Sequence, residues 1–154
     1  MIIRDQQQAL SVAVEMEKRA IRTYERALMI VQDAQVAAGI RDILSDERGH
    51  LELFSSMAQG AAAPAEERLL TEAMAADALF SGGVMEMARR EGFRSLEKLY
   101  QFAADSEKSA VENYTAFAEL ATDEQVKQAF LSIAQEEAGH LSALEHQLRQ
   151  IQEA

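Results

Sequence analysis

The sequence predicts an all-α protein built as a four-helix bundle, in which two antiparallel helix hairpins are joined by a long crossover. Alanine, leucine, glutamate, glutamine and arginine dominate, and Pro64 is the only proline in 154 residues, as expected of long uninterrupted helices. Four long stretches carry apolar residues at helical spacing. An internal repeat with an offset of 90 residues pairs the first two stretches with the last two. We expect one domain over residues 1–154, long enough to bury its own core.

The first hairpin is predicted from two helix starts. Asp5 and Gln8 form a capping-box pattern, so a helix should begin there and continue to about Val31. Asp33 can cap a second helix that runs to about Ala58. Apolar residues recur at three, four and seven positions along these stretches, which predicts amphipathic helices.

Residues 60–94 differ in composition and predict a crossover with helical pieces of its own. Pro64 suits the first turn of a helix that should reach about Phe80. A second, short helix is expected over Met85 to Arg90.

The second hairpin follows the crossover. A long helix is predicted from Ser95 to about Ala121, and the segment Thr122 to Gln125 forms another capping box. The last helix should continue to about Ile151. Two such hairpins packed together make a four-helix bundle.

The charge balance and the cysteine count limit the functional classes. The net charge is −11, which argues against nucleic acid as a partner, because phosphate binding needs a basic surface. No cysteine is present, which excludes disulfides, iron–sulfur clusters and thiol catalysis. The N-terminal residues contain no long apolar run, so we expect neither a signal peptide nor a membrane anchor, and a cytoplasmic protein.

The internal repeat aligns residues 10–54 with residues 100–144 without a gap, and thirteen of the 45 positions are identical. The identical positions gather around Glu17 to Tyr24 and around the segment Glu47 to Leu51, together with their copies. A repeat retained only for packing would keep its apolar periodicity and let individual glutamates and histidines vary. This repeat keeps residues that can ligate metals.

Each half of the repeat contains a Glu-x-x-His unit, which places a carboxylate and an imidazole one helical turn apart on one face. Each unit follows a mid-helix glutamate by thirty residues, the length of one helix down and another back. Packing the hairpins together should gather four carboxylates and two imidazoles at mid-bundle, a donor set that can hold two metal ions. Four carboxylates and two divalent ions leave no net charge to bury. The predicted ligands are Glu17, Glu47, His50, Glu107, Glu137 and His140.

Two further pairs of residues lie close to this set. Tyr24 and Tyr114 follow Glu17 and Glu107 by seven residues, so their hydroxyls could hydrogen-bond a ligand carboxylate; the alternative is a half-buried core tyrosine. Asp46 and Glu136 precede the histidines by four residues. They could accept a histidine N–H, as carboxylates beside metal-bound histidines usually do, or they could be ordinary exposed acids.

At these residues the sequence resembles the ferritin-like superfamily, and most of all the short rubrerythrin-like di-iron carboxylate proteins that lack a rubredoxin domain. The resemblance spans residues 5–150. It implies two iron ions held by the six residues named above, with manganese or zinc as substitutes. It also implies reaction with hydrogen peroxide or dioxygen, and a homodimer. The function implied is oxidation of Fe(II), or peroxide removal under oxidative stress, by an oxidoreductase of peroxidase or ferroxidase type.

Two departures from rubrerythrins leave the activity open. Without cysteine the chain needs an external electron donor, such as a separate rubredoxin-like protein. Rubrerythrins also carry a further glutamate one turn from the ligand on the third helix, whereas Ala104 and Ala110 lie one turn either side of Glu107. Simple Fe(II) oxidation and peroxide reduction therefore both stay open. The alternatives are a di-iron monooxygenase, which needs a substrate-sized cavity, and a non-catalytic metal-binding bundle.

Overall fold

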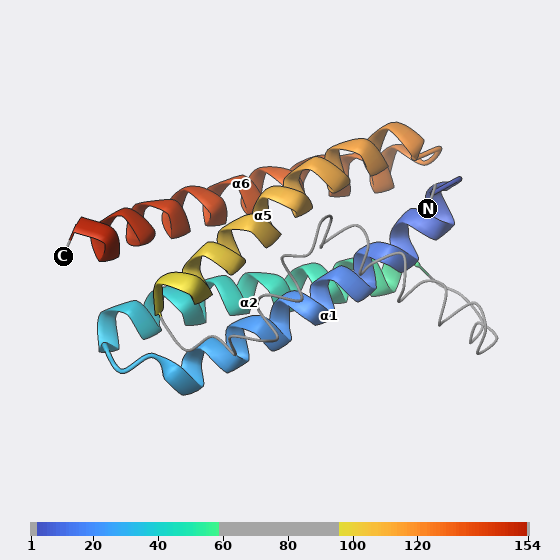
Figure 1. The fold of residues 1–154 in the computed structure, drawn as a ribbon. Helices are drawn as coiled ribbons and strands as arrows, with labels where there is room; N and C mark the ends of the chain where they lie inside the picture. The colour runs from blue at the N-terminus through green and yellow to red at the C-terminus, as the bar shows by residue number, and fades with distance from the viewer. Residues whose placement is uncertain (1–2, 59–95, 154) are drawn as a thin grey trace.

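The computed structural model describes residues 3–58 and 96–153, and this part of the chain forms four long helices (Figure 1). They are α1 (Gln6–Ile30), α2 (Ala34–Met57), α5 (Leu96–Leu120) and α6 (Glu124–Glu153). The all-α four-helix prediction is therefore confirmed, and the expected helix ends lie within about two residues of the observed ones. The helices expected after Pro64 and over residues 85–90 lie outside the described residues.

The first two helices begin at the predicted caps. The Asp5 carboxylate accepts a hydrogen bond from the Gln8 backbone N–H at 2.9 Å. The Asp33 carboxylate accepts from the N–H groups of Gln35 and Val36, both at 2.9 Å. These bonds satisfy N–H groups that have no partner within the helix. The reciprocal bond differs from the expected box, because the Gln8 side chain accepts from the backbone N–H of Arg4.

The last helix is capped one residue later than its pattern suggested. Asp123, rather than Thr122, accepts from the Gln125 N–H at 2.8 Å. The backbone N–H groups of Thr122 and Asp123 instead donate to the side-chain oxygen of Gln6, both at 2.9 Å. The start of α1 is thus tied to the turn between α5 and α6, which fixes the two hairpins relative to each other.

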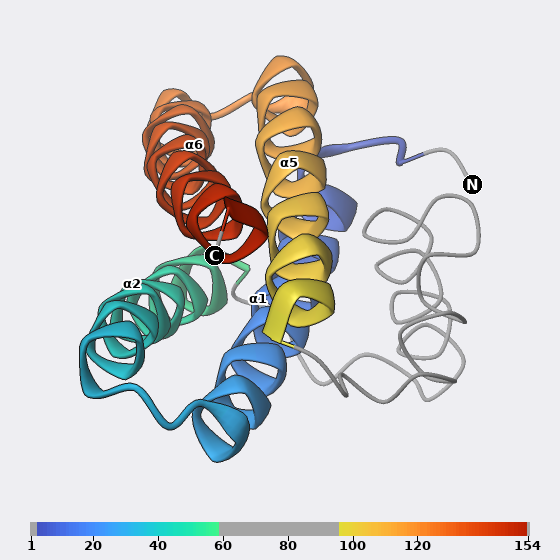
Figure 2. The same cartoon turned by 60° about the vertical axis from the view of Figure 1, so that its left-hand side comes forward.

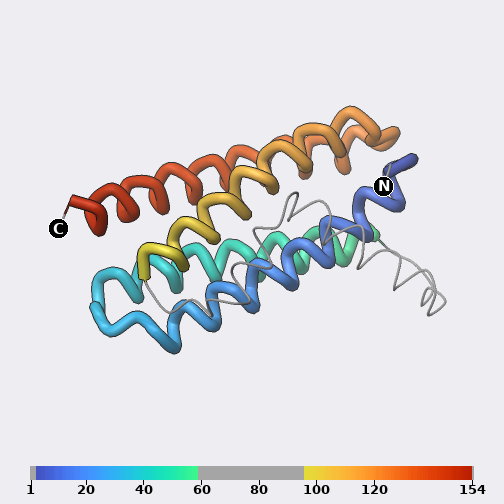
Figure 3. Tube along the Cα trace, viewed as in Figure 1, coloured from blue at the N-terminus to red at the C-terminus, as the bar shows by residue number. Residues whose placement is uncertain are grey.

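Each hairpin is antiparallel, and the two hairpins pack so that α1 lies beside α5 and α2 beside α6 (Figures 1 and 2). Following the tube from blue to red shows that α1 and α5 also run in opposite directions (Figure 3). Every helix therefore has antiparallel neighbours. This arrangement decides which residues of the two repeats can meet.

The core consists of two apolar clusters, one toward each end of the bundle. The first includes Leu10, Phe54, Tyr114 and Phe130, and the second includes Tyr24, Ile40, Leu99 and Leu144. The middle of the bundle is occupied by polar side chains, described below. Among the helices described, none is both long and apolar enough to cross a membrane.

Candidate metal centre

Six glutamate and histidine side chains are buried in the described part of the chain, and they are the six predicted ligands. Each is no more than 7% exposed. One glutamate comes from α1, one from α5, and a Glu-x-x-His unit from each of α2 and α6. Burying so many carboxylates together is costly unless their charge is compensated. The residues are Glu17, Glu47, His50, Glu107, Glu137 and His140.

The donor atoms of these residues form two overlapping sets. In each set, one ligand atom from every member lies within 4.8 Å of the others. The first set contains Glu17 and His50, the second contains Glu107 and His140, and both contain Glu47 and Glu137. Two carboxylates common to both sets are what a site for two neighbouring cations requires, because a carboxylate has two oxygens and can bridge.

Both histidines turn their Nδ1 atoms toward the carboxylates. His50 Nδ1 lies 2.7 Å from Glu137 Oε1, and His140 Nδ1 lies 3.2 Å from Glu47 Oε1. The two rings are stacked, with centroids 6.2 Å apart. Each ring therefore presents one nitrogen to the middle of the bundle and the other nitrogen to its outer surface.

The outer nitrogens contact carboxylates of the opposite hairpin. His140 Nε2 lies 2.9 Å from an Asp46 oxygen, and His50 Nε2 pairs with Glu136. Both acids are about half exposed. An Nε2–H that donates to such a carboxylate leaves the lone pair on Nδ1, the atom that faces the ligand sets. Each acid thus serves the histidine of the other repeat, not the one four residues later in its own helix.

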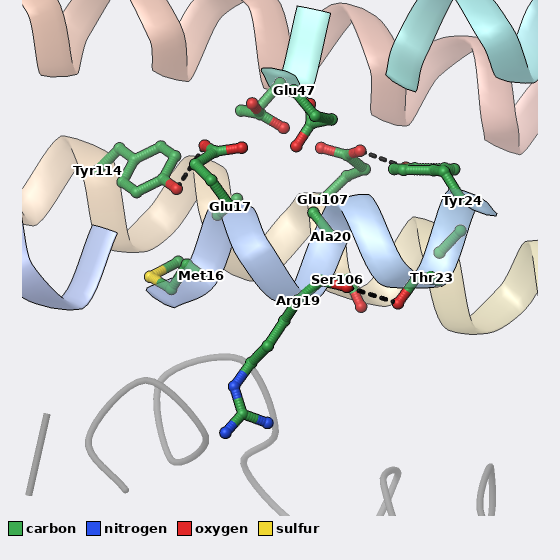
Figure 4. Close-up of a pocket in the computed structure, with 13 residues that line it drawn as sticks. Met16, Glu17, Arg19, Ala20, Thr23, Tyr24, Glu47, Ser106, Glu107 and Tyr114 are labelled. Atoms are coloured by element: carbon green, nitrogen blue, oxygen red, sulfur yellow. Dashed lines mark hydrogen bonds between the residues drawn. The ribbon is translucent and has the colours of Figure 1, made fainter. Parts of the chain in front are cut away.

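The tyrosines are paired in the same crosswise manner. The Tyr114 hydroxyl donates to Glu17 at 2.6 Å, and the Tyr24 hydroxyl donates to Glu107. Seven residues along a helix is about 10 Å, too far for a tyrosine to reach the glutamate of its own helix. Because α1 and α5 are antiparallel, the same displacement brings each tyrosine to the glutamate of the other helix (Figure 4). The structure therefore favours the carboxylate-binding alternative for both tyrosines.

Burial and mutual repulsion raise the pKa values of the site carboxyls. Burial, and then the charge of Glu107, raise the pKa of Glu47 to about 8. Burial, and then the charge of Glu47, raise the pKa of Glu17 well above its usual range. The pKa of Glu107 is raised likewise by burial and by Glu137. Burial opposes a charge on His140, but the adjoining carboxylates Glu137 and Glu47 raise its pKa to about 12. The cluster therefore attracts positive charge.

The donors fit metal ions on the evidence of their unmet hydrogen bonds. Six buried atoms of the cluster, among them Nδ1 of both histidines, make no hydrogen bond of regular geometry and face one another instead. The others are oxygens of Glu17, Glu47 and Glu137. Buried polar atoms are rarely left without partners. Carboxylate oxygens with imidazole nitrogens suit iron, manganese or zinc.

A small pocket leads to the carboxylates between α1 and α5 (Figure 4). It has about 400 Å³ of empty space, part of it open to solvent, and the volume that the centre of a water molecule can reach is about 20 Å³. That is room for one or two waters. Arg19 lies at its edge and points away from the carboxylates (Figure 4). The histidines do not line it, so the pocket approaches the site from the side opposite to them.

Several pocket residues were not predicted from the sequence. Thr23 and Ser106 line the pocket, and their hydroxyls donate to carbonyl oxygens of their own helices at 3.0 Å. Ala20 and Ala110 lie one turn after Glu17 and Glu107 and also line it. Their identity in the two repeats was a usable signal, because a small residue beside each ligand glutamate leaves space there.

Removing the Tyr114 hydroxyl should weaken the site. Tyr114→Phe leaves a buried Glu17 oxygen without its donor, which we expect to destabilise the metal-free protein by about 1–2 kcal/mol. Metal affinity should fall by about 10-fold or more. Tyr100→Phe is the matched control, because the pKa of Tyr100 is raised by burial and by Asp33, not by a site carboxylate. Denaturant unfolding and metal titration of both variants measure the difference, and equal effects would contradict the assigned role.

Removing the Asp46 carboxylate should lower metal affinity through His140. Asp46→Ala frees the His140 ring to turn and to change tautomer, and losses of about 10- to 100-fold in affinity are usual for such changes. Asp42→Ala, which removes an exposed acid one turn earlier in α2, should change affinity little. Isothermal titration with Mn²⁺ compares the two; a loss as large in Asp42→Ala would indicate a general charge effect instead.

Comparison with known proteins gives one match. The family model described as a ferritin-like domain matches residues 5–150, which covers α1, α2, α5 and all but the last three residues of α6, and includes every candidate ligand. Neither the curated proteins nor the solved structures gave a match. The match extends over nearly the whole chain and agrees with the bundle and its buried carboxylate–histidine cluster. The chain belongs to the ferritin-like domain family.

Proposed function

We propose that this protein binds two iron ions and oxidises Fe(II) with hydrogen peroxide or dioxygen. The observation that carries this function is the pair of ligand sets sharing Glu47 and Glu137. A pair of ions held by common carboxylates would supply two electrons together, which is the number needed to reduce hydrogen peroxide to water, or dioxygen to peroxide. The subtype suggested by the resemblance of the sequence is rubrerythrin-like.

The protein's own groups prepare the site for this chemistry. Asp46 and Glu136 hold the histidines with Nδ1 turned inward. Tyr24 and Tyr114 donate protons in hydrogen bonds to Glu107 and Glu17 and so hold those carboxylates in place. The raised pKa of Glu47 means that this carboxyl can also hold a proton near pH 7 when no cation is bound, so metal binding should release protons.

The dimensions of the pocket favour a small oxidant over an organic substrate. Space for one or two water molecules accommodates peroxide or dioxygen, whereas an organic substrate would need a larger cavity than the described residues enclose. The alanine at position 110 lines the pocket beside Glu107. The pocket contains four carboxylates, which belong to Glu17, Glu47, Glu107 and Glu137. The described lining therefore carries no fifth glutamate of the rubrerythrin type.

Anaerobic titration with Fe²⁺, followed by addition of peroxide or air, tests this function. We expect a stoichiometry of two and oxidation faster than that of free Fe²⁺ under the same conditions. A stoichiometry well below two would contradict the two-ion site. Two ions bound without accelerated oxidation would favour a non-catalytic metal-binding bundle. Comparison of the peroxide and air rates separates the two oxidants.

Electron supply and assembly complete the proposed function. These 154 residues contain no cysteine that could ligate an electron-transfer iron, and we expect a small electron-transfer protein of rubredoxin type to return the ions to the ferrous state. A homodimer is proposed from the resemblance. Analytical ultracentrifugation of the metal-loaded protein measures the oligomeric state.

A further inference from the structure

The two halves of the bundle differ beside the site. Around Tyr114, three phenylalanine rings fill the core, with ring centroids 5.2 Å (Phe54), 6.1 Å (Phe117) and 6.1 Å (Phe130) from that of the tyrosine. The repeat places Leu144, Ala27 and Ile40 at the corresponding positions around Tyr24. Each of the three is smaller than its counterpart. At these three positions the side chains beside Tyr24 are smaller than those beside Tyr114, whereas Leu99 and Tyr100 are larger than their counterparts Ala9 and Leu10.

A second pocket lies beside Tyr24. It has about 220 Å³ of empty space, partly open to solvent, and the volume that the centre of a water molecule can reach is about 10 Å³, which is room for about one small molecule. Its walls include Ala27, Ile40, Leu144, Leu99 and Tyr100. All four helices contribute to it. It also shares Thr23, Tyr24 and Ala103 with the pocket that reaches the carboxylates. The Tyr24 ring thus borders both spaces, and its hydroxyl donates to Glu107.

The lining of the second pocket is apolar in character. The four aliphatic walls offer no hydrogen bond, the Thr23 hydroxyl donates to the Arg19 carbonyl oxygen at 3.0 Å, and the Tyr24 hydroxyl donates to Glu107. Tyr100 is the remaining lining residue with a polar side-chain atom. Peroxide would lose its hydrogen bonds to water on entering such a space. Dioxygen is small and apolar and loses none. Apolar cavities in proteins take up small apolar molecules in this way.

We propose that this second pocket holds dioxygen and delivers it past Tyr24 to the Glu107 side of the metal centre. Its role as an oxidant route rests on the function proposed above. Peroxide uses the pocket between α1 and α5 directly, so the two oxidants approach by different routes. The difference between the repeats is then a functional one, because the pocket for the gas lies in the half containing Tyr24.

The first test needs no metal. In metal-free protein with labelled methyl groups, dissolved dioxygen under pressure enhances the nuclear relaxation of methyls that it contacts. We expect several-fold larger enhancement at Ile40 and Leu144 than at Val12 and Ile133, which are equally buried at 1–3% exposure but lie in the filled cluster. Equal enhancement at both ends of the bundle would overturn the proposal.

The second test fills the pocket. Ala27→Leu adds volume beside Tyr24, and Ala118→Leu is its matched control, because both alanines are 2% exposed and Ala118 lies in the other cluster. In iron-loaded protein we expect the ratio of air-driven to peroxide-driven oxidation to fall several-fold in Ala27→Leu. The ratio in Ala118→Leu should stay within two-fold of the unmodified protein. An unchanged ratio in Ala27→Leu would overturn the route.

A second variant covers the case in which Ala27→Leu does not fold, and the relaxation measurement distinguishes failure of the pocket proposal from failure of the proposed function. If Ala27→Leu does not fold, Ile40→Phe fills the same pocket with the residue found at the matching position of the other repeat. If the unmodified protein oxidises iron with neither oxidant, the proposed function fails. Enhanced relaxation at Ile40 and Leu144 would still support the dioxygen pocket in that case.

Discussion

Replacing Glu47 by glutamine should weaken binding of both metal ions at once. Glu47 belongs to both ligand sets, whereas Glu17 belongs to only one. We therefore expect Glu47→Gln to lower the affinity for each ion by more than about 100-fold, beyond the range usual for residues that only support a ligand. Glu17→Gln should abolish one binding step, and it should lower the affinity of the other step less than Glu47→Gln does. Titration with Co²⁺, monitored by calorimetry and by visible absorption, resolves the two binding steps.

The same substitution should have the opposite effect on the metal-free protein. Glu47 is 1% exposed, and burial together with the neighbouring carboxylates raises its pKa to about 8, so above that pH the folded protein must bury its charge, a cost that a neutral glutamine avoids. Metal-free Glu47→Gln should therefore melt at a higher temperature than the unmodified protein at pH 8.5. Glu52→Gln, at an exposed position of the same helix, is the control and should alter neither property. If both binding steps are unchanged in Glu47→Gln, Glu47 is not a metal ligand.

Stability of the metal-free protein should fall as pH rises. The pKa of Glu47 is about 8 in the folded protein and near 4.5 when unfolded, so the folded state binds more protons between these pH values. Stability then decreases with increasing pH across this window. His140, with its pKa raised to about 12, acts in the same direction above pH 6.5. We expect the melting temperature to drop by about 10 °C between pH 5 and pH 8.5.

Bound metal should reverse this dependence. Cations replace the protons of the carboxyl groups, so metal affinity rises with pH while the stability of the metal-free protein falls. Scanning calorimetry with saturating Mn²⁺ and with a chelator, each at pH 5 and pH 8.5, measures both trends. The gap between the two melting temperatures should be wider at pH 8.5. A gap that narrows at the higher pH would show that the carboxyls are not the groups that bind the metal.

Much of the fold and the ligand set followed from local patterns. Asp5 and Asp33 marked helix starts because a cap acts within three residues of its own position. The six ligands were found because the repeat preserves them, and all six are buried together. Their role as ligands stays a prediction until metal is measured.

The contacts around the ligands could not be predicted in the same way. The partner of Tyr24 is Glu107, 83 residues away, and that pairing depends on α1 and α5 being antiparallel neighbours. No local spacing encodes the direction of a neighbouring helix. The second pocket was equally hidden. Alignment of the repeats shows Ala27 opposite Phe117, but the pocket beside Tyr24 is seen only in the packed structure.

The crosswise pairing of the repeats has a consequence for folding order. A hairpin formed by α1 and α2 alone carries Glu17, Glu47 and His50, yet the groups that orient Glu17 and His50 belong to the other hairpin. In an isolated hairpin the ligand side chains would therefore not be held in one conformation, and the hairpin would bind a cation weakly. Tight metal binding should appear only after the hairpins have docked. The rate of metal uptake during refolding would therefore report the rate of this last assembly step.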